Sequence, residues 1–210
     1  MKEQNLKKLN DSRAIRWGAL AIVAFTMMAA YYVNDVVAPL KTMLETDLKW
    51  DSSEFGLFTG AYSFLNVFFL MLIWGGLILD RFGIRFTGKL ATILMVLGTG
   101  LEYYAMTGMA DATGTILGYK VSVFVASAGY SVFGVGAEVA GITVTKMIAK
   151  WFRGKEMATA MGVQVALARV GSQAAYAVAI PMARAFYNSG AGGSDLSDRW
   201  IDSFLCFLCS

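Results

Sequence analysis

The chain contains no histidine, and its 210 residues include only two cysteines and two prolines. Without histidine, the usual haem ligand and the most common general base are absent. The two cysteines, Cys206 and Cys209, lie in an apolar stretch, where two buried thiols are expected rather than a zinc site. The G-x-S-x-G motif of a serine nucleophile is absent as well. We therefore predict no metal, no cofactor and no enzymatic activity, which disfavours an intramembrane protease.

Charged residues are also scarce, at 16%, whereas 57% of the residues are hydrophobic. Such a chain has too little polar surface to cover a soluble core. Its apolar runs of about twenty residues or more, separated by short charged turns, are typical of transmembrane helices. A membrane barrel would show shorter segments of alternating hydrophobicity. We therefore predict an all-α, multi-pass protein of the lipid bilayer.

The apolar runs divide the chain into a short N-terminal arm, residues 1–16, and a transmembrane bundle, residues 17–210. The expected spans lie at about residues 17–40, 55–79, 86–109, 116–152, 157–187 and 200–210. The last run has about eleven residues, whereas a full crossing needs ~20. We therefore expect a chain that is cut off within its sixth span.

Lysine and arginine gather at one side of these spans. Twelve of the 18 fall in the N-terminal arm and in the turns near residues 81–89 and 146–155. The positive-inside rule then predicts a cytoplasmic N-terminus. Because the basic residues cluster at helix ends, the net charge of +3 does not indicate a nucleic-acid partner. A bacterial inner membrane and an endolysosomal membrane are both compatible, and we expect the bacterial inner (plasma) membrane.

Two opposite charges lie inside apolar stretches on either side of a basic turn. Glu138 and Arg169 are each about fifteen residues from the centre of that turn, so at ~1.5 Å per residue both are expected roughly 20 Å into a bilayer. A charge at mid-bilayer costs ~2.5–3.5 kcal/mol even on a mild scale, so such residues usually pair or line cavities. The two could form a structural salt bridge. Alternatively, they could hold a zwitterion, with Arg169 binding its carboxylate and Glu138 its ammonium.

Polar residues recur at helical spacing in four of the five complete spans, whereas the span at 86–109 is plainer. The groups are Tyr31, Tyr32 and Asp35; Thr59, Tyr62, Ser63 and Asn66; Ser127, Tyr130, Ser131 and Glu138; and Arg169, Ser172, Gln173 and Tyr176. We expect these four spans to line a wet cavity and the plainer span, at 86–109, to face lipid. The alternative is a dry bundle joined by interhelical hydrogen bonds of about 0.6 kcal/mol each.

The turn after the second span reads GLILDRFGIR and resembles the G-x-L-x-D-R-x-G-R-R signature of the major facilitator superfamily. The matching residues are Gly76, Asp80, Arg81, Gly83 and Arg85, while Ile84 replaces an arginine. The resemblance implies that these residues take part in conformational gating. It also implies a twelve-helix fold of two six-helix halves, with the substrate held at the midplane between them. This chain would be the N-terminal six-helix half, cut off within its sixth helix, and its partner would be a C-terminal six-helix half.

A second set of sequence motifs resembles those found in the branch of this family that contains lysosomal dipeptide uniporters. Tyr130 stands where many drug/proton antiporters have an arginine. The shared features are Tyr62-Ser63 with Asn66, Gly136 with Glu138, WFRGKE at 151–156, Gln164, and ARVGS at 168–172. The resemblance implies that Glu138 binds the amino end and Arg169 the carboxylate of a dipeptide. By the same resemblance, the cavity wall would include Tyr31, Tyr32, Asp35, Tyr62, Asn66 and Gln164.

We therefore predict a secondary transporter that moves short peptides or similar zwitterions by alternating access. One alternative is a proton-coupled carrier of organic anions, in which Arg169 holds the substrate and Glu138 is a proton site. Another is a truncated membrane protein that does not transport.

Overall fold

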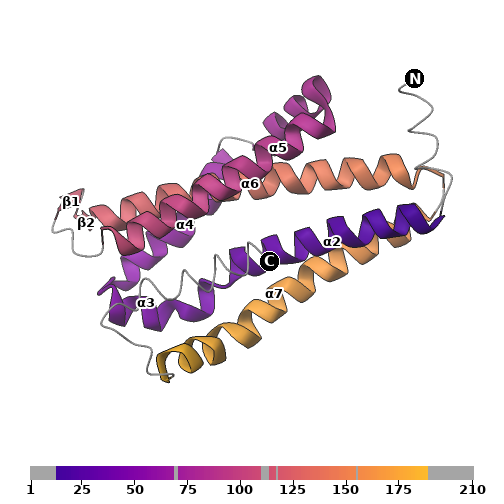
Figure 1. Ribbon diagram of the computed structural model, residues 1–210. Coiled ribbons are helices and arrows are strands. Elements are labelled where there is room, and N and C mark those ends of the chain that lie inside the picture. The colour runs from indigo at the N-terminus through magenta and orange to yellow at the C-terminus, as the bar shows by residue number, and fades with distance from the viewer. Residues whose placement is uncertain (1–12, 69–70, 110–113, 117, 155, 189–210) are drawn as a thin grey trace.

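The computed structural model describes residues 13–68, 71–109, 114–116, 118–154 and 156–188 (Figure 1). Within them the protein is helical apart from one small hairpin. The elements are α2 (Arg13–Asp35), η1 (Ala38–Leu40), α3 (Lys41–Asp47), α4 (Ser52–Phe68), α5 (Met71–Thr107), β1 (Thr115–Ile116), β2 (Tyr119–Lys120), α6 (Val121–Trp151) and α7 (Met157–Asn188). Most of the predicted N-terminal arm and the predicted segment 200–210 lie outside the described residues.

Four helices of the described ranges are long and apolar enough to cross a membrane. They cover Arg13–Thr46, Ile73–Thr107, Val121–Trp151 and Met157–Met182. Four is fewer than the six spans expected. The expected span at 200–210 lies outside the described residues, and α5 continues through the turn at Gly83 and so covers parts of two expected spans. Length and composition thus define an all-α, multi-pass membrane protein.

Gly83 divides α5 into two helical segments that run in opposite directions along α6. Its backbone angles are φ 79° and ψ 169°. Before the turn, Gly75 lies beside Val139 and Ile142 of α6, so this segment advances with α6. After the turn the order reverses, since Gly88 lies beside Thr143 and Gly98 lies beside Gly129 and Phe133. The described part of the fold therefore has a hairpin of α5 around its central helix, α6.

We expect Gly83→Ala to destabilise the protein by about 1–3 kcal/mol, because the backbone angles of Gly83 belong to a region that is essentially restricted to glycine. Nothing lies within 4 Å of a Cβ built at this position, so the penalty is conformational rather than steric. Thermal unfolding of the purified protein, followed by circular dichroism, measures the effect. Gly100→Ala is the control, since Gly100 lies in the same helix with open space around it and no positive φ. Equal stability of the two variants would contradict the described turn.

The helices form two layers that are visible side by side in Figure 1. One layer pairs α2 with α7, and the other packs α4 and both segments of α5 around α6. In the most apolar 18-residue stretch of α6, 61% of the residues are buried, whereas in the corresponding stretch of α5 only 22% are buried. On the segment of α5 after Gly83, Ile93, Val96 and Leu97 are exposed, as expected of a helix that faces lipid.

An aromatic cluster joins α4 to α6. Phe58 is fully buried, and its ring stacks on that of Tyr130 with 4.8 Å between centroids. Trp50, which precedes α4, packs on the other side of Phe58 at 5.6 Å. The hydroxyl group of Tyr130 reaches the other layer and donates a hydrogen bond of 2.9 Å to the backbone oxygen of Asn34 in α2.

The helix α6 begins at Val121 rather than near Ile116. Two short antiparallel strands precede it, with Thr115 opposite Lys120 and Ile116 opposite Tyr119. Gly118 lies in their turn with a φ of 85°, which glycine tolerates because it lacks a Cβ. Hydrophobicity alone placed Ile116 in the span, whereas Ile116 lies in the hairpin and the helix begins only after it.

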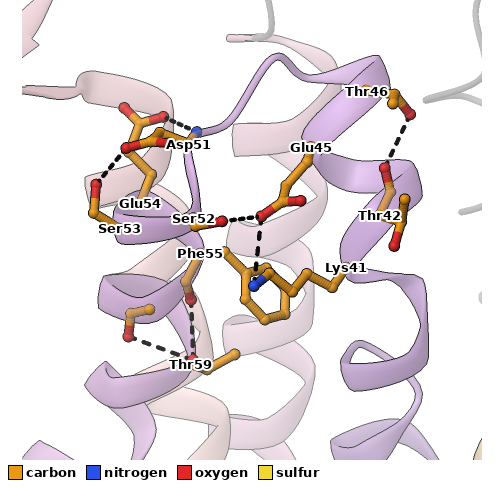
Figure 2. Close-up of polar contacts among 11 residues, drawn as sticks. Lys41, Thr42, Glu45, Thr46, Asp51, Ser52, Ser53, Glu54, Phe55 and Thr59 are labelled. Carbon is orange, nitrogen blue, oxygen red and sulfur yellow. Dashed lines mark hydrogen bonds and ion pairs between the residues drawn. The ribbon is translucent and has the colours of Figure 1, made fainter.

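Figure 2 shows the corner between α3 and α4, where polar side chains of the two helices contact one another. Glu45 of α3 accepts a hydrogen bond of 2.8 Å from the hydroxyl of Ser52 at the start of α4. Lys41 forms an ion pair with the same carboxylate at 3.6 Å. These contacts fix α3 against the beginning of the next long helix.

Glu54, which is buried, ties this corner to the hairpin before α6. One of its oxygens accepts a hydrogen bond from the backbone N–H of Asp51, and the other accepts one from the backbone N–H of Lys120, both at 3.0 Å. The ammonium group of Lys120 donates in return to the backbone oxygen of Leu48. Hydrogen bonds from the Ser53 hydroxyl and from the backbone N–H of Ser52 hold the pKa of the exposed Asp51 carboxyl below its usual range.

Candidate functional site

Glu138 lies near the middle of α6 and is half-buried. Its carboxylate accepts a hydrogen bond of 3.3 Å from the hydroxyl of Tyr62 in α4. Gly134, one helical turn before Glu138, leaves the space that the tyrosine ring occupies, because a Cβ there would lie 2.5 Å from Cδ2 of Tyr62. The acid is therefore held by a neutral donor from a neighbouring helix.

Arg169 lies on α7 in the other layer and is exposed in this structure. Its guanidinium carbon is 6.0 Å from the centre of the Tyr31 ring in α2, a cation–π contact that leaves the N–H groups of the guanidinium available. Tyr31 also lies close enough to Tyr62 for an electrostatic interaction between the two layers. Each of the two charges thus has a tyrosine as its neighbour, Tyr31 for Arg169 and Tyr62 for Glu138.

Within the described ranges, ion pairs join Arg13 to Glu156, Lys41 to Glu45 and Lys146 to Asp80. No ion pair joins Glu138 to Arg169 in that part of the chain. The structural salt bridge that the sequence left open is therefore not the arrangement found here. The reason is that the two residues lie on different layers and each has a tyrosine as its neighbour.

Asn66 is the most unusual polar residue of the predicted cavity wall. Its side chain is buried beside Tyr62 and Gly134, and both of its amide atoms lack a hydrogen-bond partner in the described part of the protein. An amide can donate and accept at once, and leaving it buried and unpaired costs about 1–3 kcal/mol. It shares this position with Tyr62, the residue that donates to Glu138.

The other predicted wall residues have different surroundings. Tyr32 and Asp35 are half-buried near the end of α2, and Gln164 is buried in α7. The Asp35 carboxylate accepts a hydrogen bond of 2.8 Å from the side chain of Asn34 rather than contacting either central charge. Sequence spacing grouped Asp35 with the tyrosines but did not reveal this local partner.

Two buried hydroxyls, those of Ser127 and Ser172, also lack a partner in the described part of the chain. They lie on α6 and α7, and helical spacing had already placed both on the polar faces.

Glu102 on α5 is the residue that the sequence undervalued. One of its carboxylate oxygens is buried without a hydrogen-bond partner among the described residues, and its backbone N–H lies against Gly129 of α6.

The residues of the GLILDRFGIR segment occupy the turn of α5. Asp80 pairs with Lys146 of α6, so its partner in this structure belongs to the same bundle. Gly76 is half-buried, whereas Arg81 and Arg85 are exposed, and the Arg81 guanidinium lies 5.9 Å from the ring of Phe82. Gly83 forms the turn itself. The segment therefore links the two parts of α5 to the end of α6.

Within the described residues, no cluster of three or more His, Cys, Asp or Glu side chains could hold a metal ion. The chemistry available in the middle of the bundle is instead that of one carboxylate, one guanidinium, several tyrosine hydroxyls and a buried amide. Such groups bind and orient a polar molecule through hydrogen bonds and charge.

The fold and these residues define a multi-pass helical membrane protein whose long helices carry two opposite charges, Glu138 and Arg169, that do not pair with each other within the described ranges. The sequence model of the Major Facilitator Superfamily matches residues 20–201. The chain therefore belongs to the Major Facilitator Superfamily, a family of membrane transporters rather than enzymes.

Among characterised relatives, the chain is similar to the "Lysosomal dipeptide transporter MFSD1" of three vertebrates. It is 29% identical to the mouse protein over 160 residues, which are 76% of this chain and 32% of the relative. It is 28% identical to the human protein over 154 residues, 73% of this chain and 30% of the relative. The zebrafish protein is 27% identical over the same length. The chain thus spans about a third of the length of the curated relatives it matches.

Proposed function

We propose that this chain is the N-terminal half of a secondary transporter that moves short peptides or similar zwitterions by alternating access. The observation that carries the proposal is the placement of Glu138 and Arg169 on opposite layers, each beside a tyrosine, with no ion pair joining them among the described residues. A peptide with free ends carries an ammonium and a carboxylate, which match these two groups. The dipeptide transporters to which the chain is similar support the same substrate class.

The complete carrier in this proposal has two six-helix halves, of which residues 17–210 supply the first. The exposure of Arg169 supports this arrangement, because a charged residue at membrane depth is expected to face a water-filled cavity or a partner rather than hydrocarbon. In such folds the substrate lies between the halves, and rocking of one half against the other exposes it to alternate sides. The N-terminus lies in the cytoplasm, and the membrane is the inner membrane of a bacterium.

Dipeptide uptake by the full-length carrier tests the proposal. We expect Glu138→Gln and Arg169→Ala each to lower uptake at least about tenfold, since each removes a charge-assisted hydrogen bond of about 1.5–3 kcal/mol. Glu45→Gln and Lys150→Ala are the controls, because they remove one charge of each sign outside the site. Undiminished uptake by both site variants, at equal amounts of protein in the membrane, would end the peptide interpretation.

A proton-coupled carrier of organic anions is the second candidate. It is favoured by the exposed guanidinium of Arg169, which can bind an anion without a second charge. In that case Arg169 would hold the anion and Glu138 would take up a proton. Competition between dipeptides and organic anions at several pH values separates the two, because anion uptake would follow the supply of protons whereas peptide uniport would not.

A further inference from the structure

A shallow groove of about 540 Å³ lies on the surface of the second segment of α5, next to the end of α6. Its lining residues are Ile84, Arg85, Gly88, Lys89, Thr92, Ile93 and Met147. Arg85 and Lys89 are four residues apart and therefore share one face of the helix. Both are exposed.

The two cations of the groove have no acidic partner within the described ranges. Lys146 of α6 differs from them, because it is paired with Asp80. The segment that carries Arg85 also begins again just after Gly83, so its N-terminus adds a partial positive charge at the same end. The groove is therefore positive at the turn of α5.

Beyond Lys89 the groove becomes apolar. Ile93 lies one helical turn, about 6 Å, farther along α5, and its side chain is 55% exposed. Gly88 contributes no side chain to the floor, and the hydroxyl of Thr92 donates to the backbone oxygen of Gly88 instead of facing outward for a ligand. Two cations followed by an apolar wall fit a molecule with an anionic head and a hydrocarbon tail.

We propose that this groove binds one anionic glycerophospholipid of the cytoplasmic leaflet. The phosphate lies between Arg85 and Lys89, and the first part of one acyl chain lies along Ile93, beyond Lys89. A free phosphate would leave the apolar wall empty, and a zwitterionic lipid would bring a second cation to a positive site. Basic pockets at the cytoplasmic ends of transmembrane helices are known to hold anionic lipid headgroups. The proposal depends on the cytoplasmic position of this turn and not on the identity of the transported substrate.

Native mass spectrometry of the purified protein in detergent tests the proposed binding of an anionic lipid. Phosphatidylglycerol and phosphatidylcholine with identical acyl chains are added in turn. We expect one phosphatidylglycerol to be retained at least about tenfold more strongly than phosphatidylcholine. Arg85→Gln/Lys89→Gln should remove this preference. Lys150→Gln/Arg153→Gln is the matched control, since it removes two exposed cations near the same end of the bundle and should leave the preference intact.

Gly88→Leu provides a second variant, because it fills the groove while both cations remain. It should also weaken retention of phosphatidylglycerol about tenfold. Circular dichroism and size-exclusion chromatography confirm that each variant is folded. Equal retention of the two lipids by the wild-type protein, or equal loss in the two double variants, would overturn the proposal. Displacement of the lipid by millimolar inorganic phosphate would also overturn it, because the site would then recognise a free anion.

Discussion

Arg169→Ala is expected to abolish the advantage of a free carboxyl end in the substrate. In the wild-type carrier, a dipeptide with a free C-terminus should be transported about ten to a hundred times better than its C-terminal amide, because the amide cannot accept two charge-assisted hydrogen bonds from the guanidinium. In Arg169→Ala both substrates should be transported equally slowly. Arg169→Lys should keep part of the preference, since lysine provides the charge without the planar pair of donors.

Glu138→Gln should show the mirror image of this pattern. The variant should lose discrimination between a free and an acetylated N-terminus and keep discrimination at the C-terminus. The measurement is competitive uptake with the four end-modified forms of one dipeptide. This crossed design separates binding from general damage, because damage lowers all four rates together. If each variant lost the preference at the wrong end, the assignment of the two charges would have to be reversed.

Gly171→Val is expected to destabilise the bundle by about 3 kcal/mol or more, or to prevent its folding. A Cβ at Gly171 would lie 2.1 Å from the backbone oxygen of Met28 and 3.1 Å from its Cα. Because these atoms belong to the backbone of α2, no side-chain rotation can relieve the clash, and the two helices must separate. Close approach of helices through small residues is the main source of packing energy in a membrane.

The matched control for this prediction is Gly162→Val in the same helix. A Cβ at Gly162 meets nothing within 4 Å, so only the lower helix propensity of valine and a change in lipid contact remain. Thermal unfolding and the yield of monodisperse protein compare the two variants. If both were equally stable, α2 and α7 would not cross at Gly171.

The sequence predicted an all-α, multi-pass protein, because apolar runs and charged turns follow directly from the thickness of the bilayer. It predicted six spans, whereas the described ranges contain four helices long and apolar enough to cross. It did not predict that the run beginning near Ile116 starts as a hairpin, because Gly118 acts on the backbone and hydropathy does not record backbone angles. It also could not foresee that Lys146 pairs with Asp80. That contact depends on the direction in which α5 passes α6.

For the candidate site, helical spacing grouped the residues but could not give their partners. Glu138 and Arg169 lie on different layers, and the neighbour of each, Tyr62 of α4 and Tyr31 of α2, depends on how the helices pack. Depth along a helix can be counted from sequence, whereas rotation about the helix axis and the distance between helices cannot. For the same reason the buried, unpaired amide of Asn66 became evident only in three dimensions.

The small residue behind Tyr62 has a consequence for redesign. A methyl group at Gly134 would lie 2.5 Å from Cδ2 of Tyr62, so the ring would have to move. The phenol that donates to Glu138 can therefore be displaced by a change at a neighbouring glycine, while both charged side chains are kept.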